Sequence, residues 1–185
     1  IYENKSDRAY TRNGISWDTE TPSMCDSDSD TAGTESAERE RRDSAPTPAG
    51  YELRETTPSI AAFRRIRREA GMTDRSREAV ERGLPNTTYG VHIVETETGT
   101  PVGMARIIGD DGTVFHVTDM AVVEAHQGRS VGTAMMDALV EWLRENAPEG
   151  ATVDLLADVD GFYERWGFKL SAPASKGMWI WTDDL

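Results

Sequence analysis

A short polar stretch, QGRSVGT at residues 127–133, lies between an apolar run and a helical pattern. The first N–H groups of a helix have no partner within the helix, and the helix dipole adds partial positive charge there. Small residues let phosphate oxygens approach that backbone closely, so such a turn can bind an anion without lysine. The candidate anion-binding residues are Gly128, Arg129, Ser130, Val131, Gly132 and Thr133. The alternative interpretation is an ordinary strand-to-helix turn, since neither G-x-x-x-x-G-K-[ST] nor G-x-G-x-x-G is present.

Several predicted elements precede this turn and must position it. Residues 87–123 contain three apolar runs, which ETETGTP and GDDG separate with the turn chemistry of hairpins. These connections are too short for crossovers, so we expect an antiparallel meander. Upstream, residues 51–56 alternate like a strand. Pro58 then suits the start of a helix that Gly71 ends, and a second short helix is expected over residues 75–83.

The helix after the turn is the clearest element of the chain. Its apolar residues recur on one face and are Val131, Met135, Ala138, Leu139, Trp142 and Leu143. An apolar strand is expected over residues 151–158 and a helical turn over 161–166, with closing strands at 167–170 and 177–181. This order predicts the α/β class, with a mixed sheet, a strand–helix–strand crossover at its centre and helices on both faces.

Charge and composition exclude several partners. The formal net charge is −13, from 33 acidic against 20 basic residues, so nucleic acid and an anionic membrane would both repel the chain. Such an acidic surface suits a salt-rich cytosol, and we expect a halophilic prokaryotic source. Residues 1–49 are polar and charged with almost nothing to bury, so they are predicted to be a disordered acidic tail before one domain at residues 50–185.

Cysteine and histidine usage argues against a disulfide framework and a metal site. Cys25 is the sole cysteine, and the three histidines lack the close spacing of metal ligands. No apolar run approaches the roughly 20 residues of a membrane span, and the first residues lack the apolar core of a secretory signal. We therefore expect a cytoplasmic protein without a metal.

Two stretches resemble the signatures of the GNAT superfamily of N-acetyltransferases. VVEAHQGRSVGTAMMDAL is similar to its motif A, Q/R-x-x-G-x-G/A, in which Gln127 opens the motif and Gly132 closes it. Ser130 replaces the usual middle glycine; its N–H remains, and its Cβ is tolerable if its φ is negative. DGFYERWGF looks like the second signature, a short helix carrying Tyr followed by Gly-Phe. The resemblance runs from Tyr51 to the C-terminus and implies the GNAT fold.

The resemblance also implies a cofactor and roles for named residues. It implies binding of acetyl-CoA and direct transfer of its acetyl group to an amine. The backbone of Met120, Ala121 and Val122 would pair with the pantetheine arm, and the amides of residues 128–133 would hold the pyrophosphate. Tyr163 would lie near the sulfur and protonate the departing thiolate, because a phenol is a proton donor at neutral pH. A half-buried aromatic residue without catalytic role is the alternative for Tyr163.

An amine must lose a proton when it attacks, so a general base is expected near the same strand. Asp119 is the first candidate, because a carboxylate within an apolar strand is costly unless it has a role or a partner. His116 has an imidazole suited to the task, although a histidine in a strand is more often simply packed. Glu124 is a third candidate, with a solvated surface carboxylate as its alternative.

The acceptor is expected to be a primary amine of a small molecule or peptide, and a homodimer is one option for assembly. The arginines of FRRIRREAG, which are Arg64, Arg65, Arg67 and Arg68, could face an anionic acceptor or form a solvated helix face. A second class of function is a catalytically silent module that binds acyl-CoA as a sensor. Ser130 and the absence of the Asn that often precedes the signature Tyr keep that alternative open.

Overall fold

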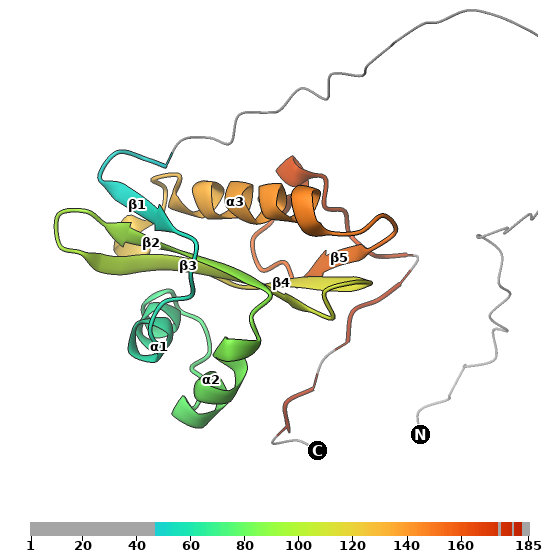
Figure 1. The fold of residues 1–185 in the computed structure, drawn as a ribbon, viewed down its shortest axis with the longest axis horizontal. Coiled ribbons are helices and arrows are strands. Elements are labelled where there is room, and N and C mark those ends of the chain that lie inside the picture. The colour runs from blue at the N-terminus through green and yellow to red at the C-terminus, as the bar shows by residue number, and fades with distance from the viewer. Residues whose placement is uncertain (1–46, 174, 179, 183–185) are drawn as a thin grey trace, which may run out of the picture. The chain divides into compact units, whose positions relative to one another are not determined.

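The computed structural model describes residues 47–173, 175–178 and 180–182, and within them five strands form one sheet (Figure 1). The strands are β1 (Tyr51–Arg54), β2 (Tyr89–Glu95), β3 (Thr100–Gly109), β4 (Val114–Val122) and β5 (Thr152–Leu155), in that order across the sheet. The predicted acidic tail lies, up to residue 46, outside the described residues, and its disorder stays a prediction.

The pairing of the strands confirms the predicted mixed sheet. β1, β2, β3 and β4 pair antiparallel with their neighbours in the chain, as the short hairpin connections require. β5 pairs parallel with β4, with Thr152–Leu155 beside Val114–Val117. A parallel pair needs a crossover, which here runs through the helix α3 (Val131–Asn146). The predicted strand–helix–strand unit is present, but it lies at one edge of the sheet and not at its centre, because no described strand pairs with the outer side of β5.

Helices cover both faces of this sheet. α3 lies on one face, while α1 (Ile60–Glu69) and α2 (Arg77–Gly83) lie on the other (Figure 1). Three short 3₁₀ helices complete the helical elements and are η1 (Leu84–Asn86), η2 (Glu124–His126) and η3 (Tyr163–Trp166). Over the described residues, no helix has the length and apolar character that crossing a membrane needs.

A β-bulge near the end of β4 changes which way its side chains point. Ala105 of β3 alone opposes Asp119 and Met120 of β4, so β4 carries one extra residue there. Asp119 takes the left-handed conformation, with φ 53°. Strict alternation from Phe115 and Val117, both buried in the core under α3, would place Asp119 in that apolar core. The bulge instead turns its carboxylate toward α1 on the opposite face.

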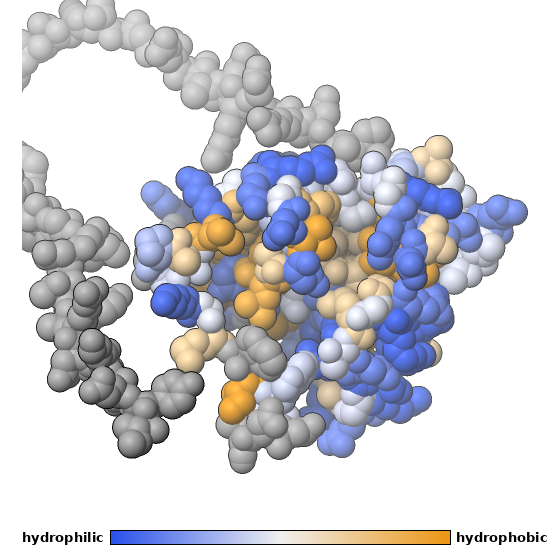
Figure 2. Space-filling view, turned by 180° about the vertical axis from the view of Figure 1, so that it is seen from behind, coloured by the Kyte–Doolittle hydropathy of each residue, from blue (hydrophilic) through white to orange (hydrophobic). Residues whose placement is uncertain are grey.

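The two predicted closing strands do not form. Residues 167–170 contain no strand, and neither do the described residues of 177–181, of which Trp179 lies outside the described part. The segment turns away from β5: the Arg75 guanidinium lies 5.0 Å from the centre of the Trp181 ring, beside α2. Because the described residues of this segment do not pair with the outer edge of β5, their backbone forms no strand ladder and their alternating apolar side chains stay exposed. Leu170 and Met178 are 83% and 94% exposed. Figure 2 shows patches of apolar surface on the face opposite to the one seen in Figure 1.

Candidate active site

The turn at residues 127–130 is exposed and leads directly into α3. The first hydrogen bond of α3 runs from the Ala134 N–H to the Ser130 carbonyl. The N–H groups of Val131, Gly132 and Thr133 therefore have no partner within the helix. No side chain caps them, and the first turn of α3 carries no acidic residue. The predicted anion-binding amides are thus available at the start of this helix.

Ser130 contradicts the expected backbone conformation. A negative φ was the condition under which its Cβ is tolerable, but Ser130 lies in the left-handed region with φ 61° and ψ 11°. Gly128, two residues earlier, also has a positive φ of 72°, so the turn uses this conformation twice before α3 begins. Ser59 and Ser76 begin α1 and α2 with ordinary φ values and cap them with their hydroxyls, which Ser130 does not. Ser130 therefore carries strain that a glycine would not.

We expect Ser130→Gly to stabilise the protein by about 1 kcal/mol, because glycine adopts a positive φ without steric cost. The greater conformational entropy of glycine in the unfolded chain offsets part of this gain. Chemical denaturation measures the change. Ser59→Gly is the matched control: it removes a hydroxyl that accepts the Ala62 N–H at 3.3 Å and should destabilise by a few tenths of a kcal/mol. Equal destabilisation by both changes would contradict the strain at Ser130.

Gly132 brings three elements of the site together. A Cβ at Gly132 would lie 3.5 Å from Cζ of Phe162 and 3.8 Å from Cγ2 of Val122. The first turn of α3, the end of β4 and the segment before η3 therefore meet at this residue. Two further contacts hold η3 against α3: Trp166 Nε1 donates to Asp137 at 2.7 Å, and Arg165 donates to the Thr133 hydroxyl at 3.3 Å. Arg165 was not predicted as a site residue.

The predicted side chains of the turn have specific partners. Gln127 Nε2 donates to the Val122 carbonyl at 2.9 Å, which ties the turn to the end of β4. Arg129 Nη1 lies 3.4 Å from the Tyr51 hydroxyl, so its guanidinium leans toward β1. Val131 is buried in the core, and its contribution to an anion site is confined to its N–H. Gln127 thus shapes the turn.

One edge of β4 is free where the expected pantetheine contacts lie. β5 pairs only with Val114–Val117, so residues 118–122 have no strand beside them on that edge, within the described residues. The Val123 N–H bonds to Val102 of β3, so alternation turns the backbone of Val122 toward the free edge. Met120 and Ala121 lie in the same free stretch. An extended amide chain could therefore hydrogen-bond along β4 past the end of β5.

Tyr163 lies at the first position of η3 and is 6% exposed. Its ring packs edge-to-face on Phe162, with ring centres 5.0 Å apart, and on Phe168 at 6.4 Å. Burial raises the pKa of the Tyr163 phenol above its ordinary value, and the negative charge of Asp158 adds to the rise. The hydroxyl therefore keeps its proton at neutral pH, as a proton donor must.

The three candidate bases have very different surroundings. Both oxygens of Asp119 are bound by arginines, Arg67 on one and Arg106 on the other. The His116 imidazole instead pairs with the carboxylate of Asp154, its neighbour across β4 and β5, and is partly exposed. Glu124 is exposed in η2. A partly exposed imidazole oriented by a carboxylate is the arrangement typical of a general base.

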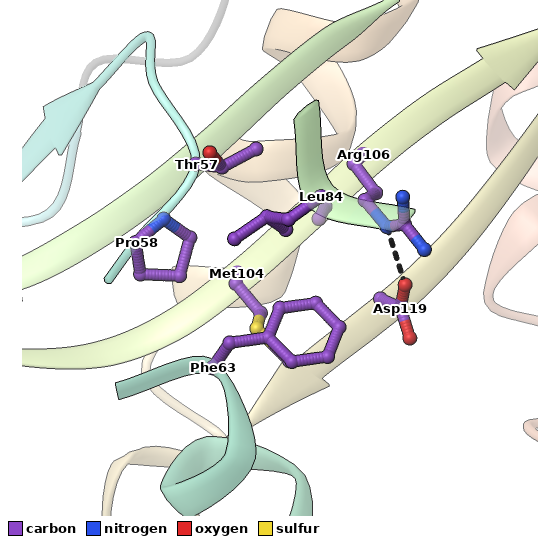
Figure 3. Close-up of a pocket in the computed structure, with 8 residues that line it drawn as sticks. Thr57, Pro58, Phe63, Leu84, Met104, Arg106 and Asp119 are labelled. Carbon is purple, nitrogen blue, oxygen red and sulfur yellow. Dashed lines mark hydrogen bonds and ion pairs between the residues drawn. The ribbon is translucent and has the colours of Figure 1, made fainter. Parts of the chain in front are cut away.

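A narrow hollow lies on the α1 side of the sheet. Phe63, Leu84 and Met104 give it an apolar lining, with Arg106 and Asp119 at one end and Thr57 and Pro58 at the other (Figure 3). Because the bulge turns Asp119 to this face, the hollow combines an apolar wall with a charged end. Strand alternation read from the sequence does not predict this arrangement.

The chain belongs to the acetyltransferase (GNAT) family, whose sequence profile matches residues 53–168. A rice (Oryza sativa subsp. japonica) relative named serotonin N-acetyltransferase 2, chloroplastic, is 27% identical over 140 residues, covering 74% of this chain and 70% of the relative. The resemblance found in the sequence is thereby confirmed at the level of the family.

Solved structures agree with this assignment. A protein of unknown function from meticillin-resistant Staphylococcus aureus, described as a probable acetyltransferase, is 34% identical with a TM-score of 0.67, covering 70% of this chain and 98% of that chain. A GNAT family acetyltransferase from Brucella melitensis in complex with acetyl-CoA has a TM-score of 0.50 at 22% identity, covering 65% of this chain and 83% of that chain. The second likeness concerns the fold alone.

Proposed function

We propose that the chain transfers the acetyl group of acetyl-CoA directly to the primary amine of a small molecule or peptide. The observation that carries the proposal is the uncapped first turn of α3 beside the free edge of β4, with Tyr163 packed next to both through Phe162. The rice relative is named an N-acetyltransferase, and the Brucella structure holds acetyl-CoA, which supports the same donor for this chain.

The residues present fit acetyl-CoA. The amides of residues 128–133 would hold its diphosphate, because N–H groups at an uncapped helix start attract negative oxygens. Arg129 and Arg165 would add positive charge on either side of that turn. Met120 and Val122 would bind the pantetheine amides along the edge of β4. When bound, acetyl-CoA supplies an activated thioester carbonyl.

Two side chains would move the protons of the transfer. As the amine nitrogen bonds to the carbonyl carbon and the carbon–sulfur bond breaks, His116 accepts the proton that the amine loses, with Asp154 holding its imidazole. Tyr163 gives its proton to the departing sulfur, for which its raised pKa keeps it protonated. Asp119 stays a candidate base from the sequence, but its two arginine partners favour a role in positioning.

We expect His116→Gln to lower kcat/KM about 100-fold at neutral pH, because the base is lost. Asp154→Asn should lower the rate less, since His116 remains but is less well oriented. His92→Gln is the matched control in the same sheet: its Nδ1 contacts the Thr56 carbonyl, and kcat/KM should stay near the wild-type value. A wild-type kcat/KM in His116→Gln would return the role to Asp119 or Glu124.

Release of free CoA thiol from acetyl-CoA with a panel of amines tests the function directly. It is best measured in molar potassium chloride and in low salt, given the net charge of −13. We expect release that needs one class of amine. Acetyl-CoA binding by calorimetry without release would favour the silent sensor, and no binding would overturn both. The expected homodimer stays a prediction that light scattering of the purified chain tests.

A further inference from the structure

Arg67, Asp119 and Arg106 form a buried charge cluster at one end of the hollow. Arg67 of α1 binds one oxygen of Asp119, and Arg106 Nε of β3 donates to the other at 2.5 Å. The three side chains are 4%, 6% and 17% exposed, respectively. Two guanidinium groups against one carboxylate leave one positive charge in excess. Within the described residues, no second carboxylate pairs with either arginine.

Arg67 and Asp119 are nearly fully buried and pair with each other, so the excess positive charge lies on Arg106, which is partly exposed and can meet a counter-charge from outside. Burial lowers the pKa of the Arg67 guanidinium, and the charge of Asp119 opposes that fall. The chain as a whole carries a net charge of −13, so this cluster is a local exception on an acidic protein. A ligand with a negative group would balance it.

Arg106 has the donors for such a ligand. A guanidinium carries five N–H donors, and Arg106 uses one on Asp119 and one on the Thr87 hydroxyl at 3.3 Å. No side-chain nitrogen or oxygen in the described part is both buried and without a partner, so Arg106 Nη2, which bonds to neither Asp119 nor Thr87, is accessible. The ring of Phe63 lies 5.7 Å from the guanidinium carbon. The two Nη groups form a planar fork that matches a carboxylate or a phosphate.

We propose that Arg106, at the charged end of the hollow, binds the anionic end of the acceptor. The inference rests on the proposed acetyl transfer and names its substrate class, a small primary amine that carries a carboxylate or phosphate. A polyamine, whose other charges are positive, would be repelled by the cluster.

The same geometry relates the anion to the reacting amine. Arg106 pairs with Thr118 across β3 and β4, and His116 lies two residues before Thr118 on the same face. Two residues along a strand span about 7 Å, so one small molecule could reach both side chains. The amine would lie toward His116 and the anion toward Arg106.

Pairs of acceptors that differ only in the anion test the proposal. We would compare β-alanine with β-alaninamide, and O-phosphoethanolamine with ethanolamine, by kcat/KM. The anionic member of at least one pair should react about tenfold faster or better, as charge-assisted hydrogen bonds predict, and the pair that shows it distinguishes carboxylate from phosphate. Equal rates within both pairs, or a preference for the neutral members, would overturn the proposal.

Arg106→Gln should remove that preference, because it should raise KM for the anionic member by a larger factor than KM for the neutral member. Arg106→Lys should keep part of it, because the charge remains but the fork is lost. Arg64→Gln is the matched control: Arg64 belongs to the exposed face of α1, where it pairs with Asp74, and its loss should not alter the preference. Equal loss in Arg64→Gln would overturn the assignment to Arg106.

A binding measurement separates this inference from the proposed function. Calorimetry with propionate and methyl phosphate, which have no amine, should show binding that Arg106→Gln weakens about tenfold or more. Such binding without acetyl transfer to any amine would retain the anion site and reject the enzyme. Acetyl transfer without binding of either anion, and without preference in the acceptor pairs, would retain the enzyme and reject the anion site.

Discussion

Tyr163→Phe should lower kcat by roughly 100- to 1,000-fold while the affinity for acetyl-CoA stays unchanged. The change removes only the hydroxyl, whose proton would otherwise pass to the departing sulfur. The ring contacts with Phe162 and Phe168 remain, so the packing of η3 is kept. Steady-state kinetics give kcat, and calorimetry with acetyl-CoA gives the affinity.

Tyr89→Phe is the control for loss of a buried phenol. Burial, with the charge of Glu55 as the next cause, raises the pKa of Tyr89 to about 12, and its ring stacks on Trp142, so it is a protonated tyrosine away from the candidate site. Its loss should leave kcat near the wild-type value. A Tyr163→Phe enzyme with wild-type kcat would remove Tyr163 from the mechanism.

Asp119→Ala should destabilise the protein by about 3–5 kcal/mol, because it leaves Arg67 and Arg106 without their shared carboxylate. Urea unfolding measures the loss. The matched control is Asp74→Ala, since Asp74 also meets two arginines, Arg64 and Arg68, but at the surface. Solvent screens that pair, so its removal should have a far smaller effect.

Asp119→Asn separates the positioning role from the catalytic one predicted from the sequence. If Asp119 holds Arg67 and Arg106 in place, the variant loses stability but the folded fraction keeps most of its kcat. If Asp119 is the general base, the variant loses stability in the same way, but kcat of the folded fraction also collapses. Kinetics at low temperature on folded protein, beside the unfolding curve, decide between the two.

Local signals were sufficient for most of the fold. Hairpin turns, Pro58 before α1 and the apolar face of α3 are short-range features, and each of the predicted elements from β1 to β5 is present. Gln127 and Gly132 also lie at the predicted turn, because the start of a helix is encoded by adjacent residues. The family motifs likewise span short segments.

Features that depend on distant partners were not predictable in the same way. The bulge at Asp119 depends on the register with β3, and no residue of β4 alone marks it. The closing strands were wrong because alternation at Leu170 or Met178 indicates a strand only where the segment reaches a sheet edge, and this segment turns away from the outer edge of β5. Arg165 reaches Thr133 across 32 positions of sequence, and Arg106 meets Asp119 through a sheet contact, so neither role has a local signal.

The parallel pairing of β5 has a consequence for the order in which parts of the protein unfold locally. β5 joins the sheet through four residue pairs at its edge, and it can dock only after α3 has returned the chain to β4. Short edge elements of this kind open at lower free energy than the central sheet, so amide hydrogens of β5 should exchange before those of β2 and β3. η3 and Tyr163 follow β5 in the chain and are expected to open with it. A ligand bound between β4 and η3 would stabilise this part of the fold, so Tyr163 should be better protected from local opening when acetyl-CoA is bound.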